Sequence, residues 1–205
     1  NAASFLISAG FECFIDIPGP ADQGKGLTER SRFISDLVSG YRYIMGQSVI
    51  IILLFIVMVI HFFVGSIEIF MPVIAEYISE SGARTLGYFQ AAFGAGGFLS
   101  GICLSRYDIS GREKTMLFSS VFIIGCLYLC ASFFDAHHAV SAILYTSMIF
   151  LFGFTIIIAA VCFKTLLQKG VDPSYSGRVF GVAGSLGNGS IPGAMIVYGL
   201  LLEKY

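Results

Sequence analysis

Residues 48–74 read SVIIILLFIVMVIHFFVGSIEIFMPVI, an apolar run that is broken by only a few polar side chains and one proline. A helix of about 20 apolar residues is long enough to cross the hydrocarbon core of a bilayer, and this run exceeds that length. Strands of membrane barrels are instead segments of about ten residues with strict alternation. The stretch therefore predicts a membrane-spanning helix.

Four further segments of the same kind follow, at residues 86–104, 115–134, 140–163 and 179–202. Residues 1–16 are expected to be the end of one more helix. Only 12% of the 205 residues are charged, about half of the fraction that is usual in soluble domains. We therefore expect an all-α membrane protein, a bundle of five full transmembrane helices plus the end of a sixth.

The basic residues separate onto two sides if each segment crosses the membrane once. One side holds Arg84 and Lys204, and the other holds Lys25, Arg30, Arg32, Arg42, Arg106, Arg112, Lys114, Lys164, Lys169 and Arg178. Loops rich in Lys and Arg stay in the cytoplasm, so the loop at 17–47 is expected to be cytoplasmic. The pattern predicts a multi-pass protein of the cell (plasma or inner) membrane, with the lipid bilayer as a partner.

The loop at 17–47 has a pattern of its own. After several prolines and glycines, Phe33, Leu37, Tyr41 and Ile44 recur near helical spacing. This spacing predicts an amphipathic helix on the inner membrane face. The segment is either a connector between two halves of a protein or a regulatory element, and the first interpretation is the simpler one.

Glu68 is the most informative residue, because a carboxylate at bilayer depth costs about 2.5–3.5 kcal/mol. It is expected to face the interior of the bundle, with His61 seven residues earlier on nearly the same helix face. A carboxyl and an imidazole on one face suit proton coupling or the binding of a cationic substrate. The alternatives are a Glu68 that reaches the outer surface and a His61 that only packs. Gln90 and Asn188 are two further polar candidates.

Glycines recur in two of the predicted helices. Gly97–Gly101 and Gly189–Gly193 have the GxxxG spacing that permits close helix contact. Gly181 and Pro192 add points where the last segment can bend. Tight packing and a gating movement are both compatible with this pattern.

Enzyme classes find little support in the sequence. It contains no HExxH, GxSxG or Walker A motif, and its five cysteines form no CxxC pair. We therefore expect no catalytic residue, no metal and no cofactor. A net charge of −1 gives no basic surface for nucleic acid.

Residues 101–114 read GICLSRYDISGREK. They resemble the cytoplasmic loop signature G-x-x-x-D-R-x-G-R-K of the major facilitator superfamily, with Ser105 where an acid is usual and Asp108 a few residues late. The segments NAASFLISA at 1–9, GYRY at 40–43 and SGRVFG at 176–181, with Pro192 and Gly193, are similar to its macrolide-efflux and siderophore-export branch.

This resemblance implies the second half of a twelve-helix transporter. Residues 1–16 would end helix six, residues 17–47 would be the cytoplasmic central loop, and residues 48–205 would hold helices seven to eleven. The N-terminal half would then be a missing partner. A cytoplasmic gate is expected at Gly101, Arg106, Asp108, Gly111, Arg112, Lys114 and Arg178. Such charges either exchange partners between two conformations or only fix the topology.

Together with this resemblance, which alone implies export, the sequence predicts proton-coupled efflux of a small amphipathic substrate that is drug-like or siderophore-like. The phenylalanines, which number 20, could line an apolar cavity for it. The alternative is a truncated membrane fragment that transports nothing, or a membrane scaffold protein.

The charge distribution makes the first testable prediction. In a variant without its native cysteines, His137→Cys should react with a membrane-impermeant thiol reagent added outside, whereas Ser110→Cys should not. Mass shifts on whole cells measure both. The reverse pattern would overturn the orientation, and labelling of both positions would overturn the number of spans.

Overall fold

The computed structural model describes residues 2–15, 38–79, 81–133 and 139–204, and every regular element among them is a helix. The chain divides into two units, residues 1–37 and 38–205. The first unit contains α1 (Ala2–Glu12), the apolar helix expected at the start of the chain. The predicted amphipathic helix lies partly outside the described residues, and its described part is helical over 38–45.

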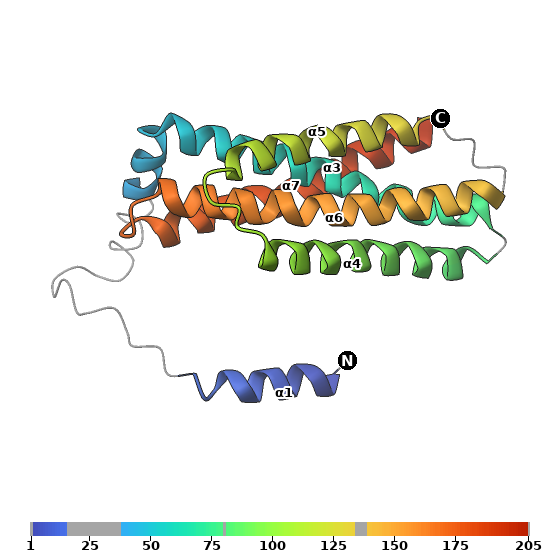
Figure 1. The fold of residues 1–205 in the computed structure, drawn as a ribbon, viewed down its shortest axis with the longest axis horizontal. Coiled ribbons are helices and arrows are strands. Elements are labelled where there is room, and N and C mark those ends of the chain that lie inside the picture. The colour runs from blue at the N-terminus through green and yellow to red at the C-terminus, as the bar shows by residue number, and fades with distance from the viewer. Residues whose placement is uncertain (1, 16–37, 80, 134–138, 205) are drawn as a thin grey trace. The chain divides into compact units, whose positions relative to one another are not determined.

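Five long helices make up most of the second unit (Figure 1): α3 (Ser48–Ile78), α4 (Gly82–Arg106), α5 (Glu113–Ala131), α6 (Ala139–Gly170) and α7 (Ser176–Lys204). Each predicted segment lies on one of them, although α5 ends at Ala131, before the predicted residue 134. The end of α6 lies beyond the predicted residue 163, because a helix can continue past its apolar part when the added side chains, such as Lys164 and Lys169, are exposed.

Four of these helices are long and apolar enough to cross a membrane: α3, α5, α6 from Ala142 onward, and α7 up to Glu203. The remaining helix, α4, is 25 residues long, and six of those residues are glycines, which add little hydropathy. The predicted number of five full spans is therefore not confirmed. The predicted domain boundaries at residues 16 and 47 stay predictions. The division into two units falls instead between residues 37 and 38, so the helix at 38–45 belongs to the second unit.

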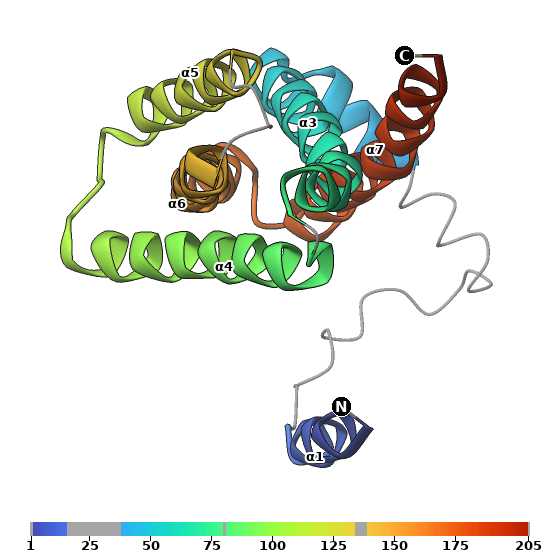
Figure 2. The ribbon, with the colours of Figure 1, turned by 90° about the vertical axis from the view of Figure 1, so that its right-hand side faces the viewer.

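The helices of the second unit lie along one another, with α6 beside α4, α5 and α3 and with α7 against α3 (Figures 1 and 2). Buried side chains form two clusters. The larger one joins Ile44, the first half of α3, the end of α6 and Val179 of α7. The smaller one is centred on Ala75, Phe89 and Tyr145. Both ends of the bundle are thus packed, and the middle of α3 lies between them.

The closest helix contact joins α4 to α6. A Cβ atom on Gly96 would lie 2.0 Å from the Phe150 carbonyl oxygen, and one on Gly153 would lie 2.2 Å from the Phe93 carbonyl oxygen. No side chain fits at these distances, so only glycine on both helices permits the crossing. Small residues at helix interfaces allow this kind of backbone contact in membranes.

The glycines that the GxxxG spacing indicated behave differently. A Cβ on Gly97 would contact the Ile157 side chain at 3.2 Å, whereas one on Gly181, Gly189 or Gly193 would meet nothing within 4 Å. Pro192 lies inside α7 and is exposed. The closest crossing therefore uses Gly96 and Gly153, and the roles of the glycines in α7 stay predictions.

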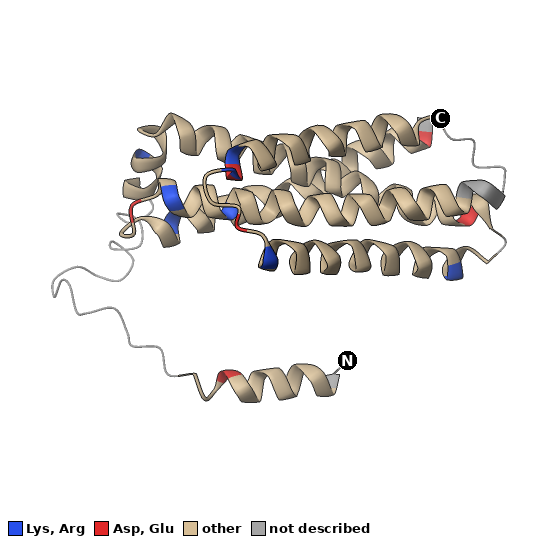
Figure 3. Cartoon of the chain, in the orientation of Figure 1, with Lys and Arg blue, Asp and Glu red and all other residues tan. Residues whose placement is uncertain are grey.

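Lysines and arginines gather at one end of the bundle (Figure 3). This end holds the last turn of α4 with Arg106, the residue before α5, Arg112, and the last turn of α6 with Lys169. This arrangement agrees with the predicted separation of most lysines and arginines onto one side of the membrane. The assignment of this end to the cytoplasm stays a prediction.

The glycine crossing makes the second testable prediction. Gly96→Ala should destabilise the bundle by about 1–3 kcal/mol, because the new methyl group must push the α6 backbone away. Thermal unfolding of the purified chain in detergent, followed by helical circular dichroism, measures the change. Gly94→Ala on the same helix is the control, since a Cβ there meets nothing within 4 Å. Equal stability of both variants would contradict the close crossing.

Candidate functional site

An apolar cavity of about 500 Å³ lies among α3, α5, α6 and α7. Its size is within the range of small-molecule sites, which span roughly 300–1,000 Å³. The lining has two serines, seven aliphatic or methionine side chains and six aromatic rings, those of Phe63, Phe70, Tyr128, Tyr145, Phe152 and Tyr198. No charged side chain is among these lining residues. We call this space the aromatic cavity.

The rings of the aromatic cavity contact one another across helices. Tyr128 of α5 lies between Phe63 of α3 and Phe152 of α6, with ring centroids 5.5 Å and 5.7 Å away. Phe70 and Tyr198 meet at 5.7 Å in an edge-on arrangement. Such pairs contribute about 0.5–1.5 kcal/mol beyond their buried area, so the rings fix each other's orientation.

One corner of the aromatic cavity is polar. The Ser66 hydroxyl, which is 2% exposed, donates to the Phe63 carbonyl oxygen at 2.7 Å and lies 2.8 Å from the Tyr128 hydroxyl. The Tyr128 hydroxyl also donates to the Phe63 carbonyl oxygen. This cluster therefore satisfies its own protons inside the bundle, as buried hydroxyls in a membrane protein must.

A second cavity, of about 150 Å³, lies between α3 and α4. Glu68 and Gln90 both line it, so the structure brings together two of the four polar residues predicted from the sequence. Both side chains are exposed in the chain by itself. Ile67, Met71 and Phe152 line this cavity and the aromatic cavity alike. The two spaces are therefore neighbours with a common wall, and we call the second one the carboxylate cavity.

His61 does not line either cavity. Its Nδ1 atom lies 2.8 Å from the Val57 carbonyl oxygen, one turn earlier in α3. Its ring packs against α7, since a Cβ on Gly187 would lie 3.1 Å from it. Asn188, the next residue of α7, is exposed. His61 and Asn188 thus line neither of the two cavities, and their predicted roles stay predictions.

Six of the seven expected gate residues lie in the loop between α4 and α5 or in the adjoining helix ends, and Arg178 lies on α7. Gly111 has a φ of 80°, a conformation that glycine adopts readily, so it makes the turn into α5. The Asp108 carboxylate accepts a hydrogen bond from the Ser110 backbone at 2.9 Å. Hydrogen bonding from Ser110, first from its side chain and then from its backbone, lowers the pKa of Asp108. The remaining members of this set are exposed: Gly101, Arg106, Arg112 and Lys114.

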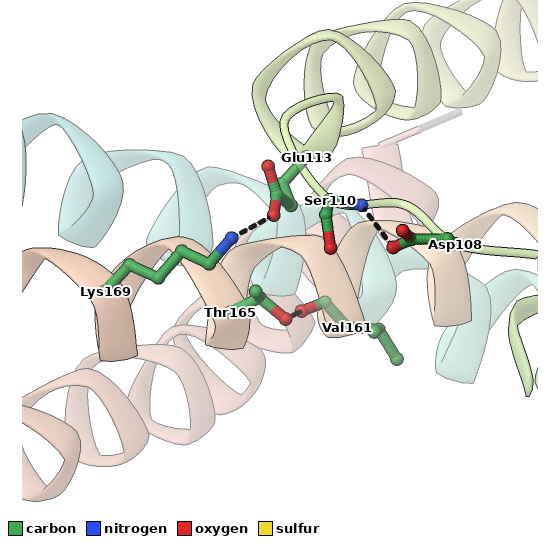
Figure 4. Close-up of polar contacts among 6 residues, drawn as sticks. All are labelled: Asp108, Ser110, Glu113, Val161, Thr165 and Lys169. Atoms are coloured by element: carbon green, nitrogen blue, oxygen red, sulfur yellow. Dashed lines mark hydrogen bonds and ion pairs between the residues drawn. The ribbon is translucent and has the colours of Figure 1, made fainter.

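Sequence reasoning missed the ion pair at this end of the bundle. Lys169 near the end of α6 donates to Glu113, the first residue of α5, and Figure 4 shows the two side chains pointing toward each other. The Glu113 side chain is 6% exposed, against 56% for Lys169. The sequence signal for this pair was an acid in the first turn of one helix and a basic residue in the last turn of another.

Arg178 connects α7 to the helix at 38–45. Its guanidinium donates to the Ser39 hydroxyl at 3.0 Å and lies 5.4 Å from the centre of the Tyr175 ring. Tyr175 in turn stacks on Tyr43, with ring centroids 4.3 Å apart. The Tyr43 hydroxyl accepts a hydrogen bond from the Asp172 backbone at 3.0 Å. Arg178, a predicted gate residue, is thus part of a cluster that holds the helix at 38–45 against the loop between α6 and α7.

Comparison with known proteins gives one finding about the family. A family model described as Major Facilitator Superfamily matches residues 2–195. No curated protein and no solved structure matches the chain.

The ion pair of Glu113 and Lys169 makes the third testable prediction. Lys169→Ala should lower the unfolding temperature of the bundle, because it leaves the Glu113 carboxylate, which is 6% exposed, without its partner. Thermal unfolding in detergent measures this change. Lys164→Ala removes an exposed charge of the same helix and should have little effect. The double variant Lys169→Ala with Glu113→Gln should recover part of the loss, and no recovery would contradict the pairing.

Proposed function

Because the chain belongs to the Major Facilitator Superfamily, we propose that it forms the substrate-binding surface of a secondary transporter for small amphipathic molecules. The aromatic cavity is the observation that supports this proposal. It is large, apolar and has one polar corner, which is the usual composition of a small-molecule site. It also lies between helices that are long and apolar enough to span a membrane.

We propose further that transport is export coupled to protons. Export is supported by the similarity of residues 1–9, 40–43 and 176–181 to the macrolide and siderophore exporters. Coupling is supported by the carboxylate cavity, where Glu68 and Gln90 lie next to the proposed substrate space. Ionisable side chains within membrane-spanning segments are rare and mark ion pathways.

The partner and the gate are part of the same proposal. The family resemblance implies a matching first half, with substrate held between two halves near the midplane of the membrane. The cluster around Asp108 and the cluster around Arg178 would then lie at the cytoplasmic end, where contacts form in one conformation and break in the other. The pair of Glu113 and Lys169 keeps α5 and α6 together at that end.

Glu68→Gln makes the fourth testable prediction. It keeps the size and hydrogen bonding of the side chain and removes its charge. Energised export should fall by roughly tenfold or more, as expected when a charge-assisted interaction is lost. Efflux is measured in cells that express the chain with the matching first half. Folding should not suffer, because a neutral amide is easier to bury than a carboxylate.

Glu76→Gln is the matched control, since Glu76 lies on the same helix and lines neither cavity. Loss of the coupling proton should impair the export of every substrate, whereas loss of a partner for cations should leave neutral substrates exported. Parental rates and an unchanged pH profile in Glu68→Gln would show that the carboxylate takes no part in transport.

A further inference from the structure

We propose that the aromatic cavity binds a lipophilic protonated amine, whose ammonium group lies at the corner formed by Ser66, Tyr128 and the Phe63 carbonyl. This inference deepens the proposed function and rests on it, because it names the substrate class of the same site. It follows from the aromatic rings, from the hydrogen bonds within the polar corner and from the charges around the cavity.

The rings provide a surface that attracts cations. Six aromatic side chains from four helices line the cavity. The face of an aromatic ring is the negative part of its quadrupole, and a cation over such a face gains about 0.5–2 kcal/mol, with the larger values in sites without water. The edge-on contact of Tyr128 with Phe152 keeps these two rings at nearly right angles, at 89°. The faces of these two rings therefore point in different directions.

The polar corner directs its protons inward and presents oxygen atoms to the cavity. The Ser66 and Tyr128 hydroxyls both donate to the Phe63 carbonyl oxygen, and the two hydroxyl oxygens lie 2.8 Å apart. The Tyr198 hydroxyl, which also lines the cavity, hydrogen-bonds with Ser66. With their protons used inside this cluster, the hydroxyl oxygens keep lone pairs for a ligand that donates. An ammonium N–H fits this arrangement, whereas a carboxylate or phosphate would require the hydroxyls to turn away from the Phe63 carbonyl.

The charges near the cavity also favour a cationic ligand. The lining contains no lysine, arginine or histidine that could attract an anion. The Glu68 carboxylate lines the neighbouring cavity, which shares Ile67, Met71 and Phe152 with this one. A buried positive charge is costly unless negative groups surround it, so a carboxylate behind the common wall lowers that cost.

Three matched probes test the proposal. They are a naphthylpropyl dimethylamine, its trimethylammonium derivative and the neutral isostere with carbon in place of nitrogen. Their naphthyl fluorescence is titrated against the purified full chain in lipid nanodiscs at pH 7. Both cations should bind roughly two- to thirtyfold more tightly than the neutral isostere, the range that cation–ring attraction covers.

Two variants separate the polar corner from the rings. Tyr128→Phe removes one acceptor oxygen and keeps the ring, so binding of the dimethylamine should weaken by roughly tenfold and binding of the trimethylammonium probe should not. Phe70→Leu removes a ring, so both cations should weaken relative to the neutral isostere. Retained binding of the neutral isostere shows in each case that the cavity is intact.

The control variants are Tyr88→Phe and Phe98→Leu, since both residues are exposed on α4 and line neither cavity. They should bind all three probes as the parent does. Equal affinity for the neutral and cationic probes would overturn the proposal and leave the transporter function standing. Failure of all three probes to bind would overturn the cavity as a ligand site. If cations bind selectively but no probe is exported under energised conditions, the proposed function fails and the cation site stands.

Discussion

The contact between α4 and α6 at Gly96 and Gly153 determines where the other functional groups lie. At this crossing the carbonyl oxygens of Phe150 and Phe93 occupy the space that Cβ atoms would need. Backbones this close are held by dispersion and by weak Cα–H contacts to carbonyls, which add up along a helix interface. Phe152 lies one residue from this crossing and borders both cavities.

The same crossing explains why the carboxylate cavity is small. Phe93 and Gln90 lie on α4, one of them at the crossing and the other one turn before it, and they face α3 across a space of about 150 Å³. The aromatic cavity, which shares Phe152 with it, is larger, and long side chains of α3, α5, α6 and α7 line it. The carboxylate cavity and the aromatic cavity therefore share a wall of side chains.

The sequence predicts the helices well and the site only in part. A continuous apolar run of more than 20 residues leaves little choice of structure, so α3 could be identified from composition alone. Glu68 and Gln90 could each be selected as costly polar residues, but their meeting depends on how α3 and α4 align, which hydropathy does not encode. Tyr128 and Tyr198 were not selected, because an aromatic residue in an apolar helix has the same hydropathy whether it faces lipid or a cavity. The spacing of Gly189 and Gly193 suggested close packing, yet GxxxG identifies a smooth helix face and not the helix that covers it.

The two neighbouring cavities give the proposed coupling of a cation to a proton a physical basis. A cation in the aromatic cavity and a proton on Glu68 would both respond to the same negative charge. In the proposed mechanism, protonation of Glu68 would remove that charge and so weaken the attraction for the cation. By linkage, a bound cation must oppose protonation as strongly as protonation opposes the cation. Mutual exclusion of this kind is what an exchange of substrate for protons requires, and it needs no direct contact between the carboxylate and the substrate, only the shared wall of Ile67, Met71 and Phe152.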